Sequence, residues 1–208
     1  MKKSKEILHK IKTSKLLKIE LIVTILELIL GTLLHFIYEW SGNNAIIASF
    51  SAVNESVWEH LKLVFYPMLI LGLIEYYFVK NIANNYIEAK AIGIFTAISF
   101  IVISFFTYTG IIGTNFFIID ILIFIISIIL GEWTSYKLMK RKNESTTQTK
   151  ILAGGILIFL LSCFIIFTYV TPQVNLFRVF TNGTYGITEH NSMKFFFCKD
   201  TLTTEIYS

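Results

Sequence analysis

Charged side chains are scarce in this sequence, at 15% of its 208 residues. A soluble domain carries about 25%, so the composition excludes an ordinary water-soluble domain. Apolar residues gather instead in successive runs of about 20, long enough to cross a hydrocarbon core about 30 Å thick. We therefore expect an all-α fold, a polytopic membrane helix bundle of five transmembrane helices with a short extracytoplasmic C-terminal tail.

Cysteine is nearly absent as well, with two in the whole chain. Cys163 lies inside an apolar run and Cys198 near the C-terminus, which excludes a disulfide framework. The first apolar run contains Glu27 and no small-residue cleavage site, which argues against a cleaved signal peptide. Basic residues stand at the ends of apolar runs and not on a face interleaved with aromatic residues, so the expected partner is the lipid bilayer and not nucleic acid.

The hydrophobic pattern divides the chain into three parts. Residues 1–18 form a basic cytoplasmic N-tail, residues 19–171 hold the bundle, and residues 172–208 form an extracytoplasmic tail in which Asn182-Gly183 predicts a hairpin turn. The five spans are residues 19–38, 57–79, 91–108, 114–130 and 151–170. Because five spans without an internal repeat do not make a self-sufficient transporter, a homo-oligomer is a candidate assembly.

The distribution of Lys and Arg predicts the orientation. Of the 18, seven lie in residues 1–18, two in residues 80–90 and five in residues 137–150. The loops after the first and third spans have none. Cytoplasmic loops carry the excess of basic residues, so we expect a cell-membrane protein with a cytoplasmic N-terminus and an extracytoplasmic C-terminus.

Polar and small residues in the first span recur every three or four positions, which places them on one helical face. They are Glu20, Thr24, Glu27, Gly31, His35 and Glu39. Carboxylates facing lipid are costly, so this face should point into the bundle. Hydrogen bonds between helices around Gly31 would explain the same stripe without any function.

Residues 50–62 place a group of polar side chains against the start of the second span, namely Asn54, Glu55, Ser56, Glu59, His60 and Lys62. Ser56 and Glu59 match a capping box, and Lys62 lies one turn from Glu59, whereas His60 has no local partner. Pro67 should kink this span and free a carbonyl near the His60 face. Glu75, Lys90 and Glu132 read as ordinary residues of a span end, a polar turn and a charged loop.

Asp120 is a single carboxylate within an apolar stretch. Counted from the preceding glycine turn at residues 109–113, Asp120 should lie roughly 10–15 Å deep in the membrane. A buried carboxylate needs a partner or a proton, so Asp120 is the most specific single-residue signal in the chain.

These signals gather toward the extracytoplasmic half and predict one polar pocket there. Its candidate residues are His35, Glu39, Asn54, Glu55, Glu59, His60 and Asp120. Three interpretations of this pocket compete. In the first, the pocket binds a small ligand, an ion or a partner, or its polar residues only stabilise the bundle. In the second the protein is a membrane-embedded metal hydrolase, and in the third it translocates ions or protons as an oligomer. The hydrolase would use a divalent metal cofactor held by His35, His60 and Asp120, with Glu55 or Glu59 as the catalytic base.

Several stretches resemble an uncharacterised family of small multi-pass membrane proteins from low-GC Gram-positive bacteria. The likeness is carried by residues 35–42, 50–63, 106–113, 184–187 and Asp120. It departs at Val179-Phe180, where an Asp-Pro pair would be expected. The resemblance implies a membrane location and fold, and no activity.

Overall fold

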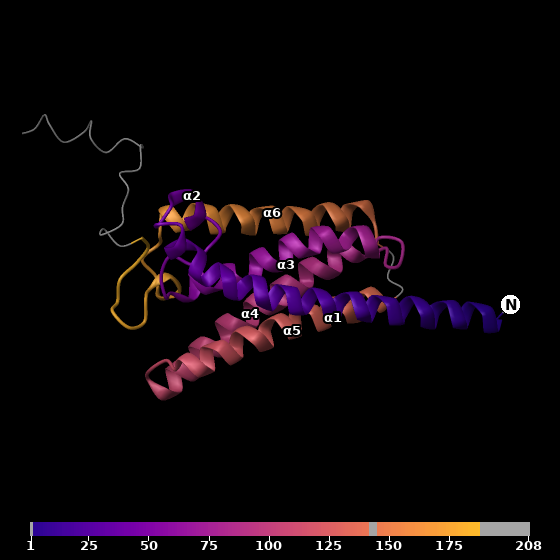
Figure 1. Cartoon of the computed structure of the whole chain (residues 1–208), viewed down its shortest axis with the longest axis horizontal. Helices are drawn as coiled ribbons and strands as arrows, with labels where there is room; N and C mark the ends of the chain where they lie inside the picture. The colour runs from indigo at the N-terminus through magenta and orange to yellow at the C-terminus, as the bar shows by residue number, and fades with distance from the viewer. Residues whose placement is uncertain (1, 142–144, 188–208) are drawn as a thin grey trace, which may run out of the picture.

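Five long helices make up most of the part of the chain that the structure describes. The computed structural model describes residues 2–141 and 145–187, with the side chains of α1 from residue 11 onward. The long helices are α1 (Lys2–Trp40), α3 (Val57–Val79), α4 (Tyr86–Ile112), α5 (Phe117–Lys140) and α6 (Thr147–Tyr169), joined by the one-turn helix α2 (Ala45–Ala48) and the 3-10 turn η1 (Asn175–Phe177) (Figure 1). All five long helices are long and apolar enough to cross a membrane, which confirms the predicted multi-pass helix bundle.

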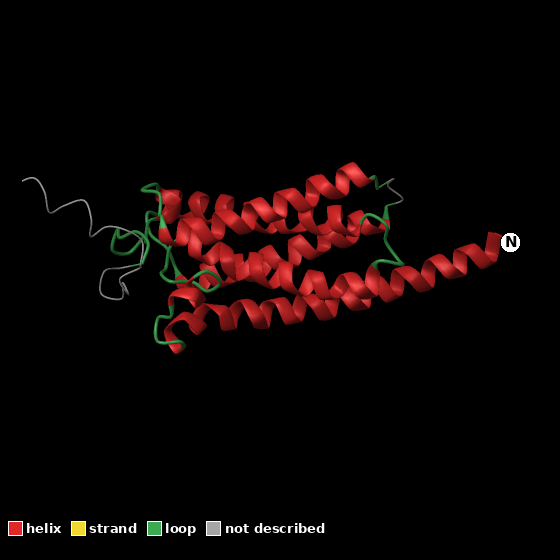
Figure 2. Cartoon of the chain, turned by 90° about the horizontal axis from the view of Figure 1, so that it is seen from above, coloured by secondary structure: helices red, strands yellow, loops and turns green. Residues whose placement is uncertain are grey.

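The helices extend further than the predicted spans. Only α3 has the predicted bounds. The predicted boundary at residue 18 falls inside α1, whose N-terminal turns project beyond the other helices (Figures 1 and 2). Polar residues at the N-terminal end of α4 and the C-terminal end of α5 are also helical, because a helix can continue beyond the apolar run that crosses the membrane.

The long helices run side by side, and their connections lie at two ends (Figure 2). The tail end holds residues 41–56, 113–116 and 170–187, on the left in Figure 1. The basic end holds residues 80–85, residue 141, residues 145–146 and the N-terminal end of α1. Two sites described below lie near these two ends.

Glycines allow helices to approach closely in the middle of the bundle. A Cβ on Gly93 of α4 would lie 2.7 Å from the Gly131 carbonyl oxygen of α5 and would clash with Ser135. A Cβ on Gly31 of α1 would clash with the carbonyl oxygen of Leu63. Pro67 has no N–H to donate to that carbonyl. The Leu63 carbonyl group is therefore without its helical hydrogen bond at the point where Gly31 of α1 packs against α3.

An aromatic cluster joins α3 to α6 and η1. The Trp58 ring centroid lies 4.6 Å from those of Phe164 and Phe177, and Phe65 lies 4.8 Å from Phe164. Much of the rest of α6 exposes large apolar side chains such as Ile158 and Phe159, as expected for a surface that faces lipid.

The predicted tail hairpin is a tight turn. Within residues 170–187 the only strand-like pairings are isolated bridges, Arg178 with Tyr185 and Val179 with Ser56. Gly183 adopts φ 74° at the turn and donates its N–H to Val179. Cys198 and the rest of the predicted tail lie outside the described residues.

Candidate functional site

A cavity of about 220 Å³ lies near the tail end, between α1, α3, α4 and α5. Apolar side chains make up most of its wall, including Leu63, Ile101, Phe105, Ile123 and Phe124. Its polar lining residues are Thr32, His35, Glu55, His60, Asn115 and Asp120. The structure therefore brings four of the seven predicted pocket residues onto one cavity.

Glu55 links the two histidines across this cavity. Its Oε1 lies 3.6 Å from His35 Nε2, and its Oε2 lies 3.4 Å from His60 Nε2. The two imidazole centroids are 5.5 Å apart. Mainly because His60 hydrogen-bonds to it, the pKa of the Glu55 carboxyl is held below its ordinary value.

The loop before α3 fixes this arrangement. Asn54 Oδ1 accepts the Ser56 N–H at 2.8 Å, and Ser56 Oγ accepts the Glu59 N–H as the N-cap of α3. His60 Nδ1 lies 2.9 Å from the Ser56 carbonyl oxygen. With an acceptor at each ring nitrogen, His60 is placed to hold both ring protons as an imidazolium.

Asp120 lies in the first turn of α5, because that helix begins only at Phe117. The prediction that it lies deep in the span was wrong, since the glycine turn is followed by residues 113–116 outside any helix. Tyr108 donates its hydroxyl proton to Asp120 Oδ1, and Asn115 Nδ2 donates to Oδ2 at 3.1 Å. A carboxylate at a helix N-terminus is also stabilised by the helix dipole.

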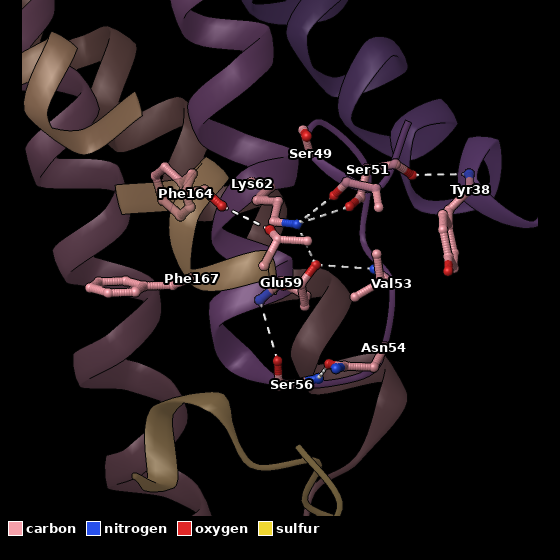
Figure 3. Close-up of polar contacts among 12 residues, drawn as sticks. Tyr38, Ser49, Ser51, Val53, Asn54, Ser56, Glu59, Lys62, Phe164 and Phe167 are labelled. Carbon is pink, nitrogen blue, oxygen red and sulfur yellow. Dashed lines mark hydrogen bonds and ion pairs between the residues drawn. The ribbon is translucent and has the colours of Figure 1, made fainter. Parts of the chain in front are cut away.

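Glu59 is buried away from the cavity and holds a loop in place (Figure 3). Its Oε2 lies 2.6 Å from Lys62 Nζ and accepts the Val53 N–H at 3.1 Å. Lys62 Nζ also donates to the carbonyl oxygens of Ala48 and Ser51. The predicted capping box is thus half formed, since Ser56 receives the Glu59 N–H while the Glu59 carboxylate turns to Lys62.

Two other predicted pocket residues also lie outside the cavity lining. Glu39 is exposed at the end of α1. Asn54 Nδ2 donates to the Gly186 carbonyl oxygen at 2.8 Å, so this side chain joins the loop before α3 to the tail.

A second polar site, which sequence reasoning missed, lies near the basic end. Lys90 Nζ donates to Glu132 Oε2 and lies 2.8 Å from Glu75 Oε2 and 3.6 Å from Glu20 Oε2. Glu27 is fully buried, and the charges of Lys90 and Glu132 act on its carboxyl group. We call Glu20, Glu27, Glu75, Lys90 and Glu132 the Lys90 cluster.

The sequence interpretation of Glu75, Lys90 and Glu132 was wrong. Each was treated as a residue of a span end or a loop, yet all three are buried inside helices. The polar stripe on α1 could have revealed them. It places the carboxyl groups of Glu20 and Glu27 inside the bundle without a basic residue beside them, so a cation has to come from another helix. Residues 20 and 27 do face the bundle as the stripe predicted.

Three carboxylates of the Lys90 cluster are close enough to share a cation. Across the described residues, the one set of three or more candidate metal ligands whose atoms lie within 4.8 Å of one another is Glu20, Glu75 and Glu132. His35, His60 and Asp120 do not form such a set. A divalent metal at the two histidines stays a prediction.

Residues 8–187 match the family DUF6512, which is described as a family of unknown function. The chain belongs to this family. No curated protein and no solved structure matches it. Both the cavity and the Lys90 cluster of this DUF6512 member fall within the matched residues. Membership therefore supports the expected unknown-function family and brings no activity with it.

Proposed function

We propose that the tail-end cavity binds one small amphipathic molecule, with its tail among the apolar side chains and its head at the two histidines. The observation that carries this proposal is the division of the lining, with polar groups gathered around Glu55 and Asp120 and apolar ones over the remainder. Ligand sites are typically apolar clefts with a few convergent polar groups. Such a lining suits a molecule that enters from the lipid bilayer.

The polar groups favour a head that bears an amine or hydroxyl over an anionic head. Two carboxylates, Glu55 and Asp120, line the cavity with one histidine placed to be an imidazolium. The Nδ1 atom of His35 is buried and has no hydrogen-bond partner among the described residues. It offers one further contact for a head group that can donate or accept a hydrogen bond.

The hydrolase alternative keeps Glu55 as its base, because Glu59 is bound to Lys62 and lies outside the cavity lining. It would require His35, His60 and Asp120 to close around a divalent ion at about 2.0–2.2 Å. The amphiphile proposal needs no such movement, which is why we favour it.

We also propose that the basic end faces the cytoplasm, so that the cavity opens toward the extracytoplasmic leaflet of a bacterial cell membrane. The basic residues of the short loops support this orientation. The C-terminus would then be extracytoplasmic. A reporter fused after Ser208 that is active only in the cytoplasm would contradict it.

The ligand class is tested with three probes of equal chain length, dodecylamine, dodecanol and dodecanoate, added to the protein in lipid nanodiscs. A ligand at 100 times its Kd stabilises the folded state by about 2.7 kcal/mol, or about 5–10 °C in melting temperature for a chain of this size. We expect this shift with the amine or the alcohol and a smaller one with the carboxylate.

Two variants link the shift to the cavity. Asp120→Asn should reduce the amine shift, because the lining loses one of its two carboxylates. Glu39→Gln is the matched control, a carboxylate near the same end that lies outside the cavity lining. Equal shifts for all three probes, or an amine shift that is unchanged in Asp120→Asn, would refute the proposed head-group site.

A further inference from the structure

The Lys90 cluster brings four carboxyl groups and one ammonium group together inside the bundle. Its members come from four helices: Glu20 and Glu27 from α1, Glu75 from α3, Lys90 from α4 and Glu132 from α5. None is more than 4% exposed. Ionisable groups at such positions in a membrane protein are costly and mark functional sites by default.

Lys90 balances only part of this negative charge. Its ammonium contacts Glu132 and Glu75 directly, and the Glu75 Oε2 atom lies 2.9 Å from the Tyr86 hydroxyl. Glu20 lies further away, at 3.6 Å. With all four carboxyl groups ionised the cluster would hold three unbalanced negative charges, which a buried site does not tolerate without bound positive charge.

Glu27 and Glu20 supply a separate observation that points to a ligand. Glu27 is 0% exposed, and neither of its carboxylate oxygens has a hydrogen-bond partner among the described residues. Both oxygens of Glu20 are likewise buried and without a hydrogen-bond partner, as is Oε1 of both Glu75 and Glu132. Six buried acceptor oxygens of the cluster therefore lack a hydrogen-bond partner among the described residues, whereas buried polar atoms are normally satisfied.

The spacing suits a hard cation. One oxygen each from Glu20, Glu75 and Glu132 lies within 4.8 Å of the others. Ca²⁺ binds six to eight oxygens at about 2.3–2.6 Å, so two oxygens on one ion lie up to about 5 Å apart. The Lys90 ammonium lies against the Oε2 atoms of these three residues. Their Oε1 atoms have no hydrogen-bond partner among the described residues and remain for a second cation.

A cavity borders the cluster between α1 and α5. It has a volume of about 320 Å³ and is lined by Glu20, Thr24, Glu132 and Tyr136, among apolar side chains. Two residues of the cluster, Glu20 and Glu132, thus belong to its wall, although both carboxylate oxygens of Glu20 are buried. The tail-end cavity has none of these lining residues and lies nearer the other end of the bundle.

We infer that the Lys90 cluster is a binding site for one small inorganic cation coordinated by carboxylate oxygens. The ionisable groups that face the site are Glu20, Glu27, Glu75, Tyr86, Lys90, Glu132 and Tyr136. This site is separate from the proposed amphiphile site and does not depend on it.

The test measures the melting temperature of the full chain in nanodiscs, with Na⁺, K⁺, Mg²⁺ or Ca²⁺ added at constant ionic strength set by choline chloride. We expect one of the four to stabilise the wild type by about 5–10 °C at pH 8 when it is present at 100 times its Kd. A cation-independent melting temperature at pH 8 would overturn the inference, whether or not the cluster binds protons.

Isosteric variants place the effect at the cluster. Glu27→Gln and Glu20→Gln remove a carboxylate with little change of shape, and each should weaken the apparent affinity at least tenfold. Glu88→Gln is the matched control, because Glu88 accepts hydrogen bonds from Ser145 and Thr149 on the same end of the bundle and is not a cluster member. A cation shift that survives in both cluster variants would show that the ion binds elsewhere and would overturn the inference. The wild-type titration decides the question even where a variant fails to fold.

Discussion

Replacing Lys90 with methionine should destabilise the protein strongly. Methionine keeps the unbranched shape of the lysine side chain but removes the only cation in the Lys90 cluster, which leaves Glu75 and Glu132 without a cationic partner. Removing one partner of a buried ion pair costs about 3–5 kcal/mol. At about 2–4 °C per kcal/mol for a chain of this length, we expect a loss of roughly 6–20 °C in melting temperature.

Thermal unfolding of the purified protein in nanodiscs measures this loss. Lys137→Met is the matched control, since Lys137 is an exposed lysine near the same end that lies 4.9 Å from the Trp133 ring centroid, and its loss should cost under about 1 kcal/mol. Adding Glu75→Gln to Lys90→Met should recover part of the loss, because one unpaired carboxylate is removed. A Lys90→Met protein as stable as the wild type would show that the glutamates are not held as partners of this lysine.

Three further predictions follow from the described contacts. Because His60 holds the pKa of Glu55 below its ordinary value, Glu55 stabilises the fold above its unfolded pKa and loses this effect as the pH falls through the lower, folded value; Glu55→Gln should therefore flatten the acid limb of the stability–pH curve, and an unchanged limb would contradict this. Gly93→Ala should cost about 1–3 kcal/mol by overpacking α4 against α5, whereas Gly154→Ala, where a Cβ meets open space, should be neutral in the same denaturation assay. Asp120→Leu should cost about 1–3 kcal/mol, since it leaves the Tyr108 hydroxyl and the Asn115 amide without their acceptor, and a stabilised Asp120→Leu protein would refute that reasoning.

The five helices could be predicted from the sequence because each apolar run is long enough to cross a membrane. Helix α3 was predicted to its ends, since Ser56 supplies a clear N-cap. The Lys90 cluster could not be predicted in the same way. Lys90 and Glu132 lie one or two residues beyond the apolar runs, where hydropathy alone assigns them to loops, and their burial depends on α4 packing against α5 at Gly93 and Gly131.

The candidate pocket was predictable in part for a related reason. His35 and His60 could be placed at similar depth because α1 and α3 are antiparallel neighbours joined at the tail end. The hydrogen-bond partners of Glu59 and Asp120 could not be predicted, because the positions of these partners depend on the paths of loops. Lys62 is the exception, as its spacing of three residues from Glu59 already indicated the pair that the structure contains.

The most direct test of the proposed amphiphile site is native mass spectrometry of the protein released from nanodiscs after incubation with dodecylamine. Ile123 is buried in the cavity wall, so Ile123→Trp would fill the space that the tail is proposed to occupy. We expect one amine per chain in the wild type and in Glu39→Gln, and none in Ile123→Trp. Equal retention of the amine by Ile123→Trp and the wild type would contradict the proposal that the cavity is the binding site.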